Sequence, residues 1–276
     1  MQKDASSQET HFFKLHGAGN DLLVVDTRDL PKRNKAAFIR KMAHRQLGIG
    51  CDQLVEVLSY KPLAIQIWNR DGSQAEMCAN GSRTFLFFAA RQRWIGQKEK
   101  RVPIQVSGGA YEGLLIKPGN YELCLGEPEI GSSDRLEIKQ DRIPFTPVKT
   151  GNPHAVIWTT GPGAWKVPAF FDFREYGPKI ESHRRFPNRT NVEFIRSCSI
   201  KGRTAKVAVD VWERGAGPTL SCGSGAVAVA AVVRQRYRVD LIKVAMTDFE
   251  LRVRFEKNRA YLSGPCALVS QGVYFS

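Results

Sequence analysis

The sequence has no long hydrophobic run. Its longest apolar stretches, Phe85–Ala90 and Ala226–Val233, are far shorter than the roughly 20 residues that a helix needs to cross a bilayer. The first thirteen residues also lack the apolar core of a secretory signal. These absences argue against a membrane-spanning or exported protein and predict a cytoplasmic one.

Metal-binding cysteine spacing is absent as well. The chain contains neither a Cys-x-x-Cys pair nor a His-Glu-x-x-His motif, so no zinc site is expected. Without an export signal, the expected state of the cysteines is the reduced thiol. The six cysteines are Cys51, Cys78, Cys124, Cys198, Cys222 and Cys266.

Acidic residues are fewer than basic ones, 27 against 41, which gives a formal net charge of +14. Such an excess raises the question of a nucleic-acid or anionic partner. However, residues 1–126 carry 18 basic and 12 acidic residues, and residues 127–276 carry 23 and 15. The even distribution favours a solvated basic surface over a dedicated nucleic-acid-binding arm. With 42% hydrophobic and 25% charged residues, the composition is that of a globular protein.

The chain contains an internal repeat. Residues 68–91 read WNRDGSQAEMCANGSRTFLFFAAR, and residues 212–234 read WERGAGPTLSCGSGAVAVAAVVR. In both copies a cysteine follows the tryptophan by ten residues, from Trp68 to Cys78 and from Trp212 to Cys222, and the offset between copies is 144 residues. The shared spacing and the offset of about half the chain together predict two related halves.

The segments after these two cysteines, Ser82–Arg91 and Ser224–Arg234, are expected to be buried helices because they are apolar nearly all round. A short strand is the alternative for the second, which is rich in alanine and valine. Two further helices are expected at Ala36–Gln46 and Phe171–His183. Strands are expected at Phe12–His16, Leu22–Asp26, Leu54–Leu58, Leu63–Trp68, Ile104–Val106, Tyr121–Leu125, Ala155–Thr159, Val192–Ile195, Val207–Trp212, Glu250–Phe255 and Tyr261–Ser263. The pattern predicts an α+β protein with two similar lobes that meet near Gly126–Pro128.

Cys78 and Cys222 each precede a predicted helix. The first N–H groups of a helix have no internal partner and favour an anion, so a thiol placed there is expected to have a lowered pKa. Two such thiols on opposite sides of one α-carbon could invert it, one removing a proton and the other returning one. The alternative is that both are buried cysteines that follow turns.

Short motifs along the chain resemble those of diaminopimelate epimerases, in the same order, from about residue 12 to the C-terminus. Besides the two cysteine segments, they are His16–Asp21, Gly48–Gln53, Asn69–Ser73, Gly151–His154, Phe186–Pro187, Thr190–Val192 and Glu213–Gly217.

The resemblance implies two pseudo-symmetric lobes, each a strand barrel around a central buried helix. The lobes would be residues 1–126, with 265–276 returning to them, and residues 127–264. The implied activity is that of a bacterial, cofactor-free isomerase that interconverts LL- and meso-2,6-diaminopimelate for lysine and peptidoglycan synthesis. The expected partner is the small molecule 2,6-diaminopimelate. Neither a membrane nor a nucleic acid is expected as a partner. A homodimer is one option for assembly.

The resemblance also assigns roles to residues. Cys78 and Cys222 would be the acid/base pair, and His154 and Glu213 would tune thiol pKa values. The implied substrate-binding residues are Asn20, Gln53, Asn69, Ala79, Asn80, Asn152, Asn191, Glu213, Arg214, Gly223 and Ser224.

Several of these positions have simpler interpretations. Asn20 and Asn69 could be turn formers, His154 a structural histidine, and Arg214 the partner of a nearby acidic side chain. The other four cysteines match no catalytic position and are interpreted as structural.

Ala79 departs from the family pattern, which usually has glycine there. Alanine keeps the backbone N–H, and we expect a helical backbone that accepts its methyl group without strain.

Two alternatives to a diaminopimelate epimerase stay open. One is a racemase of the same fold that acts on another amino acid, and the other is a catalytically impaired relative that acts as a binding protein.

Overall fold

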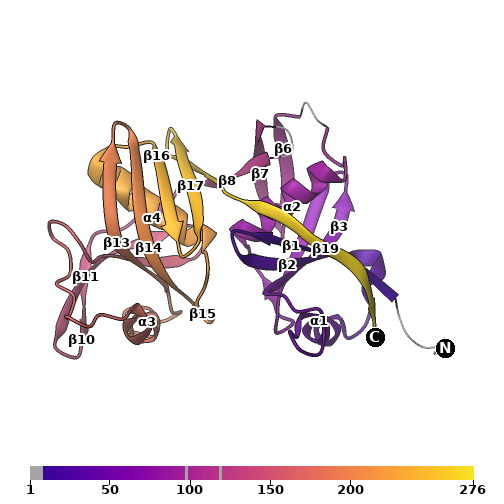
Figure 1. Ribbon diagram of the computed structural model, residues 1–276, viewed down its shortest axis with the longest axis horizontal. Helices are drawn as coiled ribbons and strands as arrows, with labels where there is room; N and C mark the ends of the chain where they lie inside the picture. Colours follow the sequence, from indigo (N-terminus) through magenta and orange to yellow (C-terminus); the bar gives the residue numbers. More distant parts are fainter. Residues whose placement is uncertain (1–8, 97–98, 118–119) are drawn as a thin grey trace. The chain divides into compact units, whose positions relative to one another are not determined.

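The computed structural model describes residues 9–96, 99–117 and 120–276 (Figure 1). It divides into two compact units: the first runs to Leu123 and includes Cys266–Ser276, and the second is Cys124–Pro265. No helix in the described part of the chain is long and apolar enough to cross a membrane.

The first unit is a curved sheet with one helix on each face. Its neighbouring strands, in order, are β19 (Cys266–Phe275), β1 (Glu9–Gly17), β2 (Asn20–Asp26), β3 (Gln53–Tyr60), β4 (Leu63–Asn69), β6 (Arg101–Val106) and β7 (Gly109–Lys117). Helix α2 (Ala79–Arg91) lies within the curve of the sheet, and α1 (Lys35–Ala43) covers the other face (Figure 1). The smaller elements are η1 (Thr27–Asp29) and β5 (Gln74–Ala75), and β8 (Asn120–Gly126) leads into the second unit.

The second unit repeats this plan. Its strands are β9 (Glu129–Ile130), β10 (Asp134–Ile138), β11 (Asp141–Lys149), β12 (Pro153–Trp158), β13 (Asn191–Lys201), β14 (Thr204–Glu213), β15 (Gly217–Pro218), β16 (Leu241–Met246), β17 (Phe249–Glu256) and β18 (Arg259–Ser263). Helix α4 (Gly223–Tyr237) lies within its curved sheet, and α3 (Phe173–Glu181) packs on β13 and β14 (Figure 1).

Strand directions show that the two units are copies of one design. In the first, β1–β2, β3–β4 and β6–β7 are antiparallel while β2–β3 and β4–β6 are parallel. The strands β11, β12, β13, β14, β16 and β17 follow the same sequence of directions. The predicted α+β fold, with two similar lobes built around buried helices, is confirmed.

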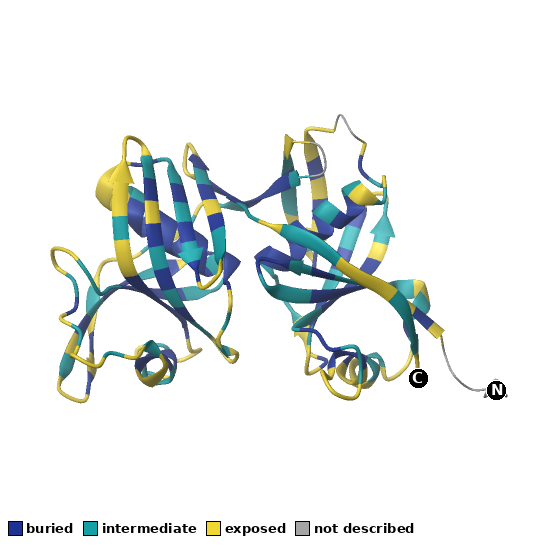
Figure 2. Ribbon diagram, viewed as in Figure 1, coloured by how far each residue is buried: buried dark blue, intermediate teal, exposed yellow. Residues whose placement is uncertain are grey.

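Both cysteine segments form helices, so the strand alternative for the second is wrong. Helix α4 consists largely of alanine and valine, and every residue from Gly225 to Val233 is buried (Figure 2). Burial on all sides by tertiary contacts outweighs the modest β-preference of valine. Each helix begins at the residue after its cysteine, at Ala79 and at Gly223, and therefore earlier than predicted.

The helices predicted at Ala36–Gln46 and Phe171–His183 form over shorter ranges as α1 and α3, and the predicted strands are present. Strands β7, β10, β11 and β16 were not predicted from the sequence. Proline lies twice within β11, and charged residues interrupt β10, so neither shows the usual strand pattern.

A buried carboxylate holds the indole of each repeated tryptophan. Trp68 Nε1 donates to Glu56 at 2.8 Å, and Trp212 Nε1 donates to Glu181 at 2.7 Å. These tryptophans stand at the ends of β4 and β14, just before the loops that lead to the two cysteines. The bonds fix the strand ends from which each cysteine loop begins.

Candidate active site

Cys78 is the N-cap residue of α2, and its side chain accepts a hydrogen bond from the Gly81 N–H at 3.2 Å. Asn20 Nδ2 donates to the same sulfur at 3.4 Å. The residue is half-buried. Such hydrogen bonds stabilise a thiolate, because they are donated to the sulfur atom that carries its negative charge.

Side-chain amides form a row at the edge of the first unit. Asn20 Nδ2 lies 3.4 Å from Gln53 Oε1, and Gln53 Nε2 lies 3.3 Å from Asn69 Oδ1. They begin β2, begin β3 and end β4, respectively, and Gln53 pairs with Asn69 across the sheet. Asn69 also donates to Ser73 Oγ at 3.1 Å within a turn, so its turn role and its place in this row of amides coexist.

The first residues of α2 include two members of the predicted set. Ala79 opens the helix with a helical backbone, as expected, and Asn80 is buried and accepts a bond from Arg83 Nη2 at 3.2 Å. Arg83, which is not among the residues predicted from the sequence, is 1% exposed and donates to Cys266 Sγ at 2.9 Å. Burial lowers the pKa of this guanidinium, while Cys266 and Cys78 oppose that shift.

Cys222 is the N-cap residue of α4 and repeats the geometry of Cys78. Its sulfur accepts from the Gly225 N–H at 3.3 Å and lies 3.5 Å from Ser224 Oγ. Its own N–H donates to Met246 Sδ at 3.4 Å. Unlike Cys78, it is buried.

The pKa of Cys222 is raised well above its ordinary value, first by burial and then by the nearby carboxylates of Glu213 and Glu193. The expectation that a helix start lowers this pKa is therefore wrong for Cys222. Desolvation and two acidic neighbours outweigh the backbone N–H and the helix dipole. Burial also raises the pKa of Glu213, which accepts from Thr219 Oγ1 at 2.5 Å.

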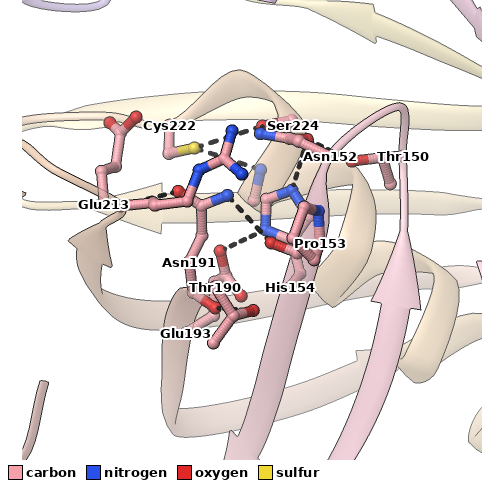
Figure 3. A network of polar contacts seen from close by, with 12 residues as sticks. Thr150, Asn152, Pro153, His154, Thr190, Asn191, Glu193, Glu213, Cys222 and Ser224 are labelled. Atoms are coloured by element: carbon pink, nitrogen blue, oxygen red, sulfur yellow. Dashed lines mark hydrogen bonds and ion pairs between the residues drawn. The ribbon is translucent and has the colours of Figure 1, made fainter. Parts of the chain in front are cut away.

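Polar side chains from β12 and β13 lie close to Cys222 (Figure 3). Asn152 Nδ2 lies 3.4 Å from Ser224 Oγ, and Asn152 Oδ1 lies 2.9 Å from His154 Nε2. On its other side, His154 Nδ1 lies 2.7 Å from Glu193 Oε1. His154 is thus buried inside a polar cluster, and its nearest carboxylate belongs to a residue outside the predicted set.

Arg214 has an exposed side chain and a fixed backbone. Asn191 Oδ1 accepts from the Arg214 N–H at 2.9 Å, and Asn191 Nδ2 donates to the Pro153 carbonyl at 3.0 Å. The guanidinium reaches a backbone carbonyl, that of Asn188, at 3.3 Å. The observed partner is a carbonyl oxygen, whereas the alternative interpretation was a pairing of Arg214 with an acidic side chain.

A family model described as diaminopimelate epimerase matches residues 12–129 and 146–268. The chain belongs to this family. A diaminopimelate epimerase of Desulfitobacterium hafniense is 36% identical, covering 94% of this chain and 96% of the relative. One of Xanthomonas oryzae pv. oryzae is 33% identical, covering 99% of each.

A solved structure described as a hydroxyproline epimerase from Agrobacterium vitis has the same fold, with a TM-score of 0.70 at 14% identity. The match covers 100% of this chain and 94% of that chain. At this identity the likeness shows the fold alone.

The remaining cysteines of this diaminopimelate epimerase family member have separate surroundings. Cys51 is buried in the core beneath α1, and burial raises its pKa to about 12. Cys124 is also buried, and none of the six cysteines, all in the described part of the chain, forms a disulfide. No group of three or more His, Cys, Asp or Glu side chains is placed to hold a metal ion within the described ranges.

Two residues near the thiols were missed in the sequence, Arg83 and Glu193. Arg83 follows Cys78 by five residues inside an otherwise small and apolar helix, which is a detectable signal. Glu193 is the third residue of β13, between Val192 and Phe194. A carboxylate flanked by core residues signals a buried polar contact, but its partner 39 residues away cannot be deduced from the sequence.

Proposed function

We propose that the protein interconverts LL- and meso-2,6-diaminopimelate in the cytoplasm, with Cys78 and Cys222 as the acid/base pair. The observation that carries the proposal is that a thiol caps the buried helix of each repeat, with its sulfur bonded to the N–H three residues on. Membership of the diaminopimelate epimerase family supports the substrate.

Inversion at the α-carbon needs a base on one face and an acid on the other. In our proposal one sulfur, as the thiolate, takes the α-proton, and the thiol of the other unit delivers a proton to the opposite face. The α-carboxylate receives charge as the first proton leaves. The opening N–H groups of α2 (Ala79, Asn80) and α4 (Gly223, Ser224) would stabilise that charge.

The other end of the substrate carries a second carboxylate and a second ammonium group. Arg214 is exposed and offers a planar, bidentate donor to a carboxylate. Amides such as Asn69, Asn152 and Asn191 can both donate and accept, and Glu213 can accept from an ammonium group. A substrate with one carboxylate would leave Arg214 without its anion, which disfavours a racemase of such amino acids.

The experiment is solvent-deuterium incorporation at the α-carbon of LL- and meso-diaminopimelate, followed by NMR. The wild-type protein should incorporate deuterium from either isomer, while Cys78→Ala and Cys222→Ala should each lose at least about 1000-fold in epimerisation. Cys198→Ala, on the half-buried outer part of β13, is the control and should stay active. A wild type that exchanges neither isomer, or that prefers a one-carboxylate amino acid, would contradict the proposal.

A further inference from the structure

The two thiols lie in equivalent places but not in equivalent surroundings. Strand pairing places Leu54 opposite Trp68 in the first unit and Val192 opposite Trp212 in the second. The next residue along each strand is Val55 in the first unit and Glu193 in the second. A buried carboxylate therefore replaces a buried valine at the matching position.

The same register matches Leu22 with His154. Leu22 pairs with Gln53 at the start of β3, and His154 pairs with Asn191 at the start of β13. Both positions are almost fully buried. The second unit thus has a histidine and a carboxylate where the first has two aliphatic side chains.

His154 and Glu193 form a closed pair. Nδ1 and Oε1 are 2.7 Å apart, and both side chains have no exposed surface. On the other side of the ring, Nε2 lies 2.9 Å from Asn152 Oδ1. Both ring nitrogens therefore face oxygen atoms, and the imidazole holds the Glu193 carboxylate in one position.

Glu193 lies against the first turn of α4. A methyl group added at Gly225 would come within 2.6 Å of Glu193 Oε1 and 3.2 Å of Cys222 Sγ. The second carboxylate oxygen, Oε2, is buried with no hydrogen-bond partner in the part of the chain that the structure describes. The pair thus places its negative end beside the thiol, in surroundings with little water to screen it.

We propose that Glu193, held by His154, is a positioning residue that keeps the proton on Cys222 in the resting enzyme, so that Cys78 is the thiolate and Cys222 the thiol. The inference rests on the proposed function for its catalytic meaning, but the proton on Cys222 can be measured without turnover. Among the described residues, Glu213 on β14 and Glu193 on β13 act on Cys222 by charge, and His154 on β12 faces it only through its contact with Glu193.

The first unit supports this assignment from the other side. Asn20 and Gly81 donate to the Cys78 sulfur, and the buried guanidinium of Arg83, which donates to Cys266 Sγ, also acts electrostatically on Cys78. At the position of Arg83, five residues after the cysteine, α4 has Val227. The helix position that has a basic side chain in the first unit therefore has an aliphatic one in the second.

The test is alkylation with iodoacetamide across pH 5–11, with Cys78 and Cys222 quantified separately by peptide mass spectrometry. In the wild-type protein Cys78 should reach half of its maximal rate at a pH at least about one unit below that of Cys222. Equal or reversed midpoints would overturn the proposal, and this measurement needs no variant.

Glu193→Gln keeps the size of the side chain and removes its charge. At pH 7.5 it should raise the alkylation rate of Cys222 about three- to tenfold, because one pKa unit is a tenfold change in the thiolate fraction. Cys78 in the same molecules should be unchanged. The matched control is Asp210→Asn, which removes a half-buried carboxylate of β14 in the same unit, 3.1 Å from Arg196, and should leave both rates unchanged.

A parallel rise at both thiols, or a rise in Asp210→Asn as well, would indicate general loosening and overturn the proposal, as would no change at Cys222. If Glu193→Gln does not fold, Glu193→Asp keeps the charge and should keep the wild-type order of the two midpoints. In the epimerase assay, Glu193→Gln should shift the pH profile of kcat with little change in KM. Failure of the proposed function would appear separately, as a wild type that does not epimerise diaminopimelate.

Discussion

At the residue scale, the two glycines that donate to the sulfurs of Cys78 and Cys222 differ in the room around them. A methyl group at Gly225 would come within 2.6 Å of Glu193 Oε1, whereas at Gly81 its nearest contact would be Cys78 at 3.4 Å. The glutamate cannot move without breaking its 2.7 Å contact with His154. The close approach of Glu193 therefore requires glycine at position 225, whereas position 81 has room for a methyl group.

We therefore expect Gly225→Ala to reduce the free energy of unfolding by about 1–3 kcal/mol and to impair epimerisation. Gly81→Ala should be neutral or stabilising by up to about 1 kcal/mol, because alanine is the better helix former. Urea unfolding of both variants measures the difference. Equal destabilisation of the two would contradict the close approach of Glu193 to α4.

A second feature at the residue scale is the lowered pKa of the Asp21 carboxyl group. Burial alone would raise the pKa of Asp21, but hydrogen bonds and charges from Arg45, Asp52 and Lys14 lower it to about 2. Arg45 and Lys14 lie 2.9 and 3.0 Å from its carboxylate. A carboxylate with a lowered native pKa stabilises the fold above its unfolded-state pKa, and this contribution is lost as the pH falls.

The contribution of Asp21 should accordingly be complete above about pH 4 and disappear as the pH approaches 2. Chemical unfolding at several pH values should give a wild-type stability that falls through this window. In Asp21→Asn the fall should be smaller, with lower stability at pH 7. An unchanged slope in the variant would show that other carboxylates control acid unfolding.

At the element scale, the start of α2 decides whether Ala79 harms the enzyme. The residue lies inside the helix, directly after its N-cap, where an L-residue has its ordinary backbone conformation. The extra methyl group therefore carries no backbone strain, and the N–H remains available to a carboxylate.

Ala79→Gly should change kcat/KM for diaminopimelate by less than about threefold and should lower stability by up to about 1 kcal/mol. Epimerisation measured in both directions, together with thermal unfolding, checks both numbers. A large gain in activity for the glycine variant would mean that the methyl group crowds the substrate.

At the scale of the whole molecule, the proposed mechanism brings one thiol from each unit to the same α-carbon. Mild oxidation should then join Cys78 to Cys222 and abolish activity, and dithiothreitol should restore it. A disulfide needs Cα atoms about 4.4–6.8 Å apart. Peptide mapping of the oxidised protein is the measurement, and Cys78→Ala is the control. An inactive oxidised protein without this link would contradict the shared site.

The sequence by itself determined the repeat, the two capped helices and the family. These features depend on local signals: a tryptophan ten residues before each cysteine, glycine three residues after it, and an apolar run of helical length. Local spacing is enough, because a helix and its cap are formed by neighbours in the chain. For the same reason a helical backbone could be expected at Ala79, although the helix begins there and not at Ser82 as predicted.

Only the tertiary structure decided that the two thiols have different surroundings. The contact of Glu193 with His154, and the place of both beneath Gly225, depend on strands that are adjacent in space but far apart in the chain. From the sequence, both cysteines stand at helix starts and both are expected to have a lowered pKa. Burial and two carboxylates reverse this for Cys222, because desolvation and charge act through space and not along the sequence.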